Sequence, residues 1–383
     1  MKRVALLGST GSIGASTLGV IKRFPKLFRC EALAANTDIK TLARQIKLFR
    51  PSVVCVFDRG KSVELARTAC GRTRVVSGPE GLNEICRHPG VDSVVAAISG
   101  SEALAPVCAA VESGKEICLA NKECLVMAGD IIMRRAAAKG AAIRPIDSEQ
   151  SAIWQCLLGE EGNPAARIWL TASGGPFWKR KGSLERVRLA ETLRHPRWKM
   201  GRKITVDSAT MMNKGLEVLE AMHLFGVAPS DIEVVIHPGS VVHSMVEFAD
   251  GTVKAQLSQT DMRIPIQFAL SFPRRLPSGL VPLDFFALKS LDFHRPDMRR
   301  FPCLGFAYQA ARDGGTMPSV MNAANEAAVA AFLKGRLSFT GIPRVIENVM
   351  RRHRVIKRPG LKEIMAADRW SRDEADALME RAH

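Results

Sequence analysis

The 383-residue sequence lacks the features that mark base-stacking and disulfide-stabilised proteins. Aromatic residues make up 6% of the chain, with one tyrosine, so nucleic-acid bases would find few rings on which to stack. None of the nine cysteines forms a C-x-x-C pair, and the pattern indicates neither a disulfide framework nor a zinc site. A cytoplasmic, reducing location is the simplest expectation for such a chain.

Long apolar runs are also absent. The best stretch, Val94–Val111, is interrupted by Glu102 and Pro106, whereas a membrane-spanning helix needs about 18 apolar residues. The basic and apolar start of the chain stops at Gly8, which predicts a strand and not an export signal. We therefore expect a soluble protein with no membrane partner.

Several catalytic motifs are missing. The sequence contains no G-x-S-x-G and no H-E-x-x-H, and Gly114-Lys115 is followed by Glu116 without the upstream glycine of a P-loop. Esterase, zinc-protease and P-loop NTPase chemistry are therefore excluded as interpretations.

Positive charge is what the chain has in excess. Lys and Arg number 55 against 38 acidic residues, a net charge of +17, which favours anionic partners such as phosphorylated small molecules, nucleic acid or an anionic surface. Basic clusters at Lys179–Lys181 and Arg351–Arg358 have few aromatic residues among them. We interpret them as solvated faces and expect no nucleic-acid partner.

The N-terminal part of the chain alternates short apolar runs with helical stretches, a pattern typical of a doubly wound α/β (Rossmann-like) parallel sheet over residues 1–147. The strand candidates are Val4–Leu7, Ala32–Ala35, Val53–Phe57, Val94–Ile98, Ile117–Ala120 and Ile143–Ile146.

The order of elements then becomes mixed, which predicts an α+β catalytic domain over residues 148–272. Its elements are a helix at Ser151–Leu158, a strand at Ile168–Ala172, a basic loop at Lys179–Lys203, a helix at Met211–Phe225 and strands near Val234, Met245 and Val253. Frequent prolines predict a linker over 273–302. Amphipathic stretches at Asn322–Leu333 and Ile342–Met350 predict a small helical domain over 303–383.

The first strand is followed by a glycine-rich turn, Gly8–Gly14, which opens a helix. Glycines let the backbone approach a pyrophosphate, and the helix N-terminus supplies free N–H groups, so this context predicts dinucleotide binding. The second strand ends in Ala35-Asn36-Thr37 where an NAD enzyme usually has Asp or Glu. The missing acid favours NADP, although Asp38 is close by.

Carboxylates form a second group of candidates. Asp147-Ser148-Glu149 follows a strand, at the sheet edge where doubly wound proteins bind ligands, and carboxylate oxygens suit Mg²⁺ or Mn²⁺. The alternative is a capping box of Asp147 with Gln150. Glu217 supplies a third carboxylate, on a helical segment where Asn213 and Lys214 share its face; a surface Lys–Glu pair is the alternative.

Two loops complete the candidates. Ser173-Gly174-Gly175 follows an apolar strand and could bind phosphate through its N–H groups and hydroxyl. The polar segment Leu193–Gly201, with a histidine and a tryptophan, could be a lid or an ordinary basic loop. His237 and His243 are interpreted as packed or surface residues, not ligands.

Taken together, these segments resemble the 1-deoxy-D-xylulose 5-phosphate reductoisomerase family. The similarity runs over nearly the whole chain and is carried by Gly8–Gly14, Leu119–Glu123, Asp147–Ser151, Thr171–Phe177, His195–Gly201 and Val206–Glu217. It implies a cytoplasmic homodimer of the non-mevalonate isoprenoid route that uses NADPH and Mg²⁺, Mn²⁺ or Co²⁺. The implied reaction rearranges and reduces the substrate to 2-C-methyl-D-erythritol 4-phosphate.

The resemblance also implies roles for individual residues. The metal ligands are expected to be Asp147, Glu149 and Glu217, and the catalytic residues Lys122, Glu149 and His195. The expected phosphate-binding residues are Ser173, Ser208, Asn213 and Lys214. Further substrate contacts are expected from Lys122, Ser148, Glu149, His195, Glu217 and Trp198. Of these, Trp198 is expected to cover the site. The cofactor contacts are expected to be Thr10, Gly11, Ser12, Ile13, Asn36, Asn121, Glu123 and Gly201.

Two other functions stay open from the sequence. An NADP-dependent dehydrogenase of another phosphorylated or carboxylated metabolite would need the glycine-rich turn but no carboxylate trio, so metal dependence separates it from the first hypothesis. A nucleotide-sensing protein that uses its charge on DNA would bind DNA more weakly as salt rises.

Overall fold

The computed structural model describes residues 1–68, 72–198 and 200–381. The chain forms two compact units, neither of which is continuous in sequence. The first unit comprises Met1–Cys124, Ile132–Ser151 and Asp261–Leu280, and the second comprises Leu125–Ile131, Ala152–Thr260 and Val281–His383. The sequence-based division at residues 147, 272 and 302 follows chain order and stays a prediction.

A seven-stranded parallel sheet forms the centre of the first unit, in the order β4-β3-β2-β1-β5-β6-β7. Its strands are β1 (Lys2–Leu7), β2 (Phe28–Ala35), β3 (Val53–Val56), β4 (Arg74–Ser77), β5 (Ser93–Ala96), β6 (Glu116–Leu119) and β7 (Ile143–Pro145). The strand order reverses at β1, between β2 and β5, which is where doubly wound sheets form their ligand crevice. The predicted α/β class is confirmed, and β4, a short edge strand with only two apolar residues, is the one the sequence did not predict.

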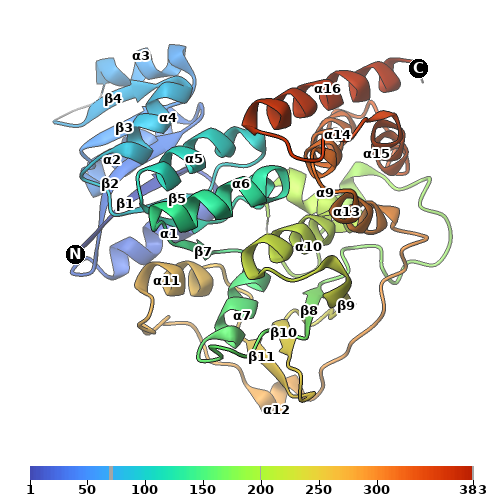
Figure 1. Ribbon diagram of the computed structural model, residues 1–383. Helices are drawn as coiled ribbons and strands as arrows, with labels where there is room; N and C mark the ends of the chain where they lie inside the picture. The colour runs from blue at the N-terminus through green and yellow to red at the C-terminus, as the bar shows by residue number, and fades with distance from the viewer. Residues whose placement is uncertain (69–71, 199, 382–383) are drawn as a thin grey trace. The chain divides into compact units, whose positions relative to one another are not determined.

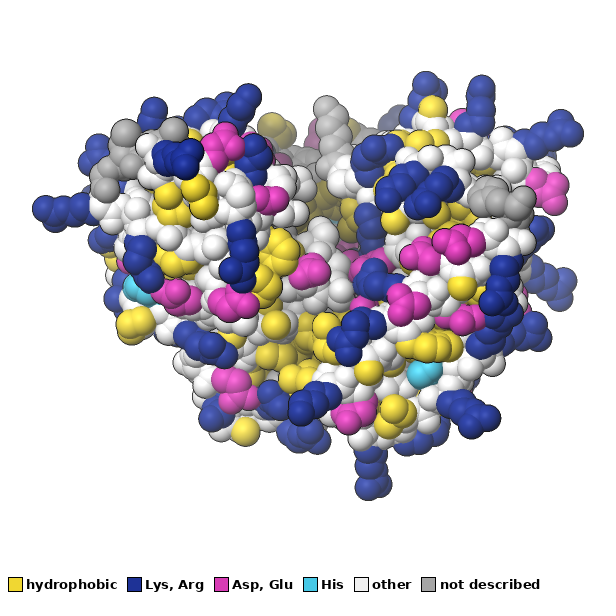
Figure 2. All heavy atoms as spheres, turned by 90° about the horizontal axis from the view of Figure 1, so that it is seen from above, with side chains coloured by type: hydrophobic (Ala, Val, Ile, Leu, Met, Phe, Trp, Pro, Cys, Tyr) yellow, Lys and Arg dark blue, Asp and Glu magenta, His cyan; other side chains and the backbone are white. Residues whose placement is uncertain are grey.

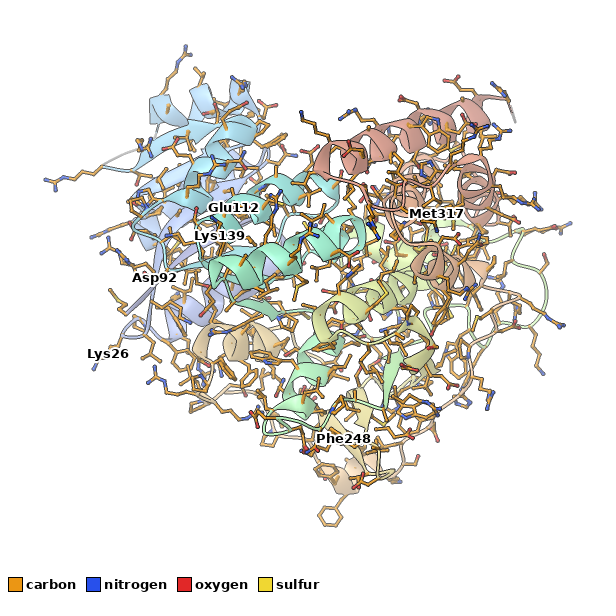
Figure 3. The ribbon with its side chains drawn as sticks, in the orientation of Figure 1. Lys26, Asp92, Glu112, Lys139, Phe248 and Met317 are labelled. Carbon is orange, nitrogen blue, oxygen red and sulfur yellow. The ribbon has the colours of Figure 1, made fainter. Side chains whose placement is uncertain are left out.

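Helices connect these strands (Figure 1). The connecting helices are α1 (Ser12–Arg23), α2 (Ile39–Phe49), α3 (Arg59–Thr68), α4 (Gly78–Arg87), η1 (Ser101–Ala103), α5 (Leu104–Glu112) and α6 (Glu123–Lys139). Two helices follow the last strand of this sheet: α7 (Ser148–Leu157), which continues into the second unit from Ala152, and α11 (Arg263–Ser271). Figure 3 labels Glu112 of α5 and Lys139 of α6, whose side chains form a 3.6 Å ion pair between these two helices. Leu6, Leu33 and Val54, from three neighbouring strands, are fully buried in the core of this unit.

Helix α11 belongs to the first unit although it lies far along the chain. Lys2 and Arg144 both pair with Glu116, at 2.8 and 2.5 Å, and donate to the carbonyls of Leu270 (2.7 Å) and Ala269 (3.2 Å) near the end of α11. Cations at a helix C-terminus stabilise it, so this cluster anchors α11 next to α1 (Figure 1).

The second unit contains a four-stranded mixed sheet in the order β11-β10-β8-β9. Its strands are β8 (Arg167–Ala172), β9 (Ile232–Ile236), β10 (Val242–Glu247) and β11 (Val253–Leu257). The β8–β9 pair is parallel, and β10 is antiparallel to both β8 and β11. The strands predicted near these positions are therefore confirmed.

Helices pack on this sheet and continue to the C-terminal end. They are α8 (Leu189–Thr192), α9 (Arg202–Thr210), α10 (Met212–Phe225), η2 (Pro229–Asp231), α12 (Phe285–Leu288), α13 (Pro302–Asp313), α14 (Met317–Leu333), α15 (Gly341–Arg352) and α16 (Leu361–Glu380). The prediction of one loop over 179–203 is partly wrong, because α8 lies inside it and α9 begins at Arg202. Helix α9 escaped prediction since its sequence is polar and rich in β-branched residues.

Buried aliphatic side chains join the helices of the second unit into one core. Leu304 of α13, Val320 and Met321 of α14 and Ile346 of α15 are fully buried together with residues of α9 and α10. The predicted helical C-terminal region is thus present, and it packs against the segment that carries several candidate site residues. Across the parts of the chain that the structure describes, no helix has both the length and the apolar character needed to cross a membrane.

Candidate functional site

The glycine-rich turn leaves its backbone open to a ligand. Gly8 has φ 85°, and a Cβ there would overlap the carbonyl oxygen of Ala97. A Cβ on Gly14 would lie 2.5 Å from the carbonyl oxygen of Ser9, so helix α1 can start close against the strand only with glycine at this position. Gly11 is the N-cap of α1. The turn with Thr10, Ser12 and Ile13 therefore has the shape that a pyrophosphate requires.

A side chain from α2 supports this turn from behind. The amide of Gln45 donates to the carbonyl of Ser9 (2.9 Å) and accepts from its hydroxyl (2.7 Å), and Ser9 is fully buried. The hydroxyl and the carbonyl of Ser9 are thereby fixed, so the turn is preorganised before any ligand binds.

The carboxylate that follows β2, that of Asp38, caps its own helix. Asp38 is the N-cap of α2, and its Oδ1 accepts from the N–H of Thr41 at 3.0 Å. This backbone hydrogen bond holds the pKa of Asp38 below its usual range. Asn36, directly after β2, is exposed, and the cofactor contact implied for it stays a prediction.

The segment after β6 is tightly held. The amide of Asn121 donates to the carbonyls of Ile98 (2.7 Å) and Gly100 (2.9 Å), and its Oδ1 accepts from the N–H of Cys124 (2.8 Å). Asn121 and Glu123 are both buried. The side chain of Asn121 thus positions the loop after β5, and the cofactor contacts implied for Asn121 and Glu123 stay predictions.

Lys122 and Asp147 meet at the carboxyl edge of the first sheet. They follow the neighbouring parallel strands β6 and β7, and Nζ of Lys122 lies 2.5 Å from Oδ2 of Asp147. Both side chains are mostly buried, and the hydroxyl of Ser148 donates to the carboxylate of Glu149. The carboxylate of Asp147 faces a buried cation, and Asp147 also directly precedes α7, so the capping-box alternative stays open beside the metal-ligand prediction.

Two serine hydroxyls converge on one imidazole in the second unit. Nε2 of His195 lies 3.0 Å from Oγ of Ser173 and 3.1 Å from Oγ of Ser208. The turn after β8 packs directly on α9, since a Cβ on Gly175 (φ 67°) would lie 2.6 Å from the carbonyl oxygen of Ser208. The two serines, which lie far apart in sequence, therefore form one polar patch.

The same imidazole is fixed by the loop that carries it. Nδ1 of His195 accepts from the N–H groups of Trp198 (2.8 Å) and Arg197 (3.2 Å), so in the neutral ring the proton resides on Nε2, directed at the serines. The ring of Trp198 lies 6.4 Å from the buried ring of His243. Lys199 of this predicted lid lies outside the described residues, and Gly201 is the exposed N-cap of α9.

A sharp corner joins α9 to α10. Met211 has φ 62°, and the first turns of α10 then present Asn213, Lys214 and Glu217. Nδ2 of Asn213 lies 2.5 Å from Oε1 of Glu217, and Lys214 pairs with the other carboxylate oxygen. The prediction that an amide, an ammonium and a carboxylate converge is confirmed. The alternative of a surface pair is wrong, because Lys214 and Glu217 are 4% and 1% exposed.

The sequence did not single out the polar groups behind α9. Asp207, 1% exposed, lies 2.9 Å from Nζ of Lys203 and accepts from Nδ2 of Asn325 at 2.9 Å. Asp207, next to candidate Ser208, was the signal available in the sequence. Its partner Asn325, however, lies more than 100 positions away. His237 and His243 are buried, as one of the two interpretations expected.

The cysteines offer no nucleophile among the described residues. Each described cysteine is a buried free thiol. Burial raises the pKa of Cys118 and of Cys303 to about 12, which keeps both protonated at neutral pH.

On the face drawn in Figure 2, the positive charge is spread out. Figure 2 shows Lys and Arg side chains dispersed over the visible face with Asp and Glu among them, although the chain carries a net charge of +17. The buried polar groups described above are thus the more specific candidates for binding an anion.

Comparison with known families covers most of the chain. The family model for 1-deoxy-D-xylulose 5-phosphate reductoisomerase matches residues 4–129, and the model for its C-terminal domain matches residues 143–225. A further model, the DXP reductoisomerase C-terminal domain, matches residues 257–374.

Individual relatives are similar in sequence to this chain over nearly their full length. The 1-deoxy-D-xylulose 5-phosphate reductoisomerase of Pelotomaculum thermopropionicum is 49% identical, with 97% of each chain covered. That of Endomicrobium trichonymphae is 46% identical, with 99% of each chain covered.

Solved structures match the fold closely. A DOX-P reductoisomerase in complex with NADPH, fosmidomycin and magnesium has a TM-score of 0.94 and 40% identity, covering 99% of this chain and 98% of the other. The enzyme from Zymomonas mobilis in complex with NADPH has a TM-score of 0.92 and 39% identity, with 99% of each chain covered.

Proposed function

Because the chain belongs to the 1-deoxy-D-xylulose 5-phosphate reductoisomerase family, we propose that it converts 1-deoxy-D-xylulose 5-phosphate into 2-C-methyl-D-erythritol 4-phosphate with NADPH and a divalent metal ion. This reaction belongs to the non-mevalonate route to isoprenoid precursors. The observation that carries the proposal is identity of 46–49% to named relatives over at least 97% of the chain. A generic dehydrogenase or a DNA-binding sensor does not account for that similarity.

The substrate phosphate is assigned to the polar groups of the second unit. Ser173 and Ser208 offer hydroxyls beside the Nε2–H of His195, and Asn213 and Lys214 add an amide and a buried ammonium. These are the donor types that a phosphate dianion requires. Fixing the remote phosphate orients the reacting end of the sugar, so its binding energy contributes to catalysis.

The residues present suit both implied cofactors. Gly8 and Gly14 leave no room for a Cβ against the neighbouring backbone, so strand, turn and helix α1 lie as close together as a pyrophosphate-binding turn requires. The ligand set Asp147, Glu149 and Glu217 consists of carboxylate oxygens, which Mg²⁺ and Mn²⁺ prefer. When bound, NADPH supplies a hydride and the metal ion a Lewis acid for adjacent carbonyl and hydroxyl oxygens.

Residues of the chain perform the remaining tasks. Lys122, buried beside Asp147, places positive charge next to the sugar oxygens, and Ser148 and Glu149 are proposed to contact the same end of the substrate. The loop of Trp198 covers the site and excludes water from a reactive aldehyde. Gly201, at the end of this loop, is proposed to contact the cofactor.

The proposal is tested by NADPH absorbance with 1-deoxy-D-xylulose 5-phosphate and Mn²⁺. We expect oxidation that needs both substrate and metal, is abolished by EDTA and is much slower with NADH. Oxidation that persists in EDTA would overturn the metal-dependent reaction, and folded, NADPH-binding protein without activity would favour another dehydrogenase.

The ligand assignment is tested separately with Glu217→Gln. Loss of one carboxylate ligand should lower metal-dependent turnover by at least about 100-fold while the NADPH dissociation constant stays unchanged. Glu247→Gln is the matched control, because Glu247 accepts from Trp169 in the second unit (2.7 Å) and a glutamine can do the same. Full activity of Glu217→Gln would rule out this ligand.

We also propose that the protein is a cytoplasmic homodimer joined through the second unit. Strand β11 is an edge strand and exposes Val253, and the nearby segment exposes Val281, Phe285 and Phe286 at 78%, 64% and 95%. The two segments are linked by a hydrogen bond from Gln259 to the carbonyl of Pro282 (3.3 Å). An open strand edge beside exposed aromatic rings is suited to pairing with a second copy.

The dimer proposal is tested by light scattering of the purified protein. We expect a dimer for the parent and a monomer for Phe286→Glu. The control Leu48→Glu changes a 58% exposed residue of α2 in the first unit and should stay dimeric. A monomeric parent would overturn the proposal.

A further inference from the structure

We infer that Asn325, in the C-terminal helix α14, is a positioning residue for phosphate binding that acts through Asp207 and α9 on Ser208. The inference rests on the proposed function, since it assumes that Ser208 contacts the substrate phosphate. It extends the site to a helix that carries none of the residues proposed to touch substrate or cofactor.

The contact is short and fully enclosed. Nδ2 of Asn325 donates to Oδ1 of Asp207 at 2.9 Å, and Lys203 pairs with Oδ2 at 2.9 Å. Asn325 is 0% and Asp207 1% exposed. A buried carboxylate is costly unless its oxygens are paired, so each partner stabilises the observed position of Asp207.

Helix geometry separates the two faces of α9. Asp207 and Ser208 are consecutive, so their side chains point about 100° apart around the helix. Asp207 faces α14, whereas Ser208 faces His195 and the turn after β8. The contact with Asn325 therefore fixes the rotation and depth of α9 from a face about 100° away from the one that carries Ser208.

The face of α9 that carries Ser208 has no room for a shift of the helix. A Cβ on Gly175 would lie only 2.6 Å from the carbonyl oxygen of Ser208, and His195 spans both serines at 3.0 and 3.1 Å. A small rotation of α9 would separate the Ser208 hydroxyl from Ser173. Phosphate binding would weaken although none of the proposed phosphate ligands had changed.

The neighbouring asparagine of α14 provides a matched control. Asn322 is also 0% exposed and lies on the same helix, but its amide donates to Glu326 at 3.2 Å, within α14. Replacing either asparagine by alanine removes the same atoms from the same core. Only the change at Asn325 should reach the phosphate patch.

The test compares kcat/KM for 1-deoxy-D-xylulose 5-phosphate among Asn325→Ala, Asn322→Ala, Ser208→Ala and the Asn325→Ala/Ser208→Ala double variant. We expect Asn325→Ala to lose about 10-fold, mainly through KM, Asn322→Ala to lose less than about 2-fold, and the double variant to be no worse than Ser208→Ala alone. Dissociation constants for NADPH should be equal in all four variants.

A second readout separates positioning from general damage. The residual rate with 1-deoxy-D-xylulose, which has no phosphate, should be the same for Asn325→Ala and the parent. Additive losses in the double variant, or an equal loss with the substrate that lacks phosphate, would overturn the inference. Inactive parent protein would instead refute the proposed function. If Asn325→Ala does not fold, Asn325→Leu, which keeps a similar volume but has no donor for Asp207, replaces it in the same comparison.

Discussion

In the first unit the predicted pyrophosphate turn is one run of residues, Gly8–Gly14, whereas the predicted phosphate residues of the second unit come from the turn after β8, from α9 and from α10. The first depends on backbone N–H groups and on the absence of Cβ atoms. The second depends on side chains held by one imidazole and by a corner at Met211. At Gly8 and Gly14 the contiguous site leaves no room for an added Cβ, while the dispersed site depends on how its helices are packed.

Gly14→Ala is expected to have the largest effect on the backbone site. The added Cβ overlaps the carbonyls of Gly8 and Ser9, so α1 must move away from the turn. We expect NADPH affinity to fall at least about 100-fold, equivalent to about 3 kcal/mol, measured by fluorescence titration.

The control for Gly14→Ala lies on the same helix. A Cβ on Gly19 meets nothing within 4 Å, so Gly19→Ala should bind NADPH normally and be slightly more stable. Normal NADPH binding by Gly14→Ala would refute the assignment of the turn.

The reciprocal change is Gly175→Ala in the second unit. Its Cβ would lie 2.6 Å from the carbonyl of Ser208 at a positive φ of 67°, so the turn and α9 must separate. We expect kcat/KM for the phosphorylated substrate to fall about 30-fold with unchanged NADPH affinity.

Gly182→Ala isolates the backbone effect, because Gly182 has φ 89° but a Cβ there meets nothing within 4 Å. It should retain most of the activity. If Gly175→Ala weakened NADPH binding as much as Gly14→Ala does, the two sites would not be separable.

The two turns also show which parts of the fold and of the candidate site the sequence can predict. The alternation of strands and helices and the turn Gly8–Gly14 are local patterns, so the first sheet was predictable apart from edge strand β4. The face shared by Asn213, Lys214 and Glu217 is set by helix periodicity and was also predictable. The placement of Ser173 beside Ser208 and of Asn325 behind Asp207 depends on packing between distant segments, which no local pattern encodes.

A smaller effect on turnover is expected from Trp198→Ala, in the loop that carries His195. The N–H of Trp198 holds Nδ1 of His195 at 2.8 Å, but that bond comes from the backbone and survives Trp198→Ala. Loss of the indole should lower turnover about 10-fold by admitting water, with a melting temperature close to that of the parent.

The control for the loop is Arg186→Ala, because Arg186 is an exposed residue of the preceding polar segment. This variant should change neither turnover nor the melting temperature. Parallel losses of activity and stability in Trp198→Ala would contradict the lid and identify Trp198 as a packing residue.

The smallest effect is expected from Gln45→Ala, which removes the amide behind the glycine-rich turn as Asn325→Ala removes the amide behind α9. Gln45 makes two hydrogen bonds to Ser9, at 2.7 and 2.9 Å, but Ser9 is also held by its own N–H bond to the carbonyl of Ala34 at 2.8 Å. We therefore expect a loss of about 1 kcal/mol in unfolding free energy and only a few-fold weaker NADPH binding. Calorimetry and fluorescence titration measure the two quantities on one sample. A larger loss of affinity than in Gly14→Ala would mean that the first site, like the second, depends on side-chain support from a neighbouring helix more than on its backbone.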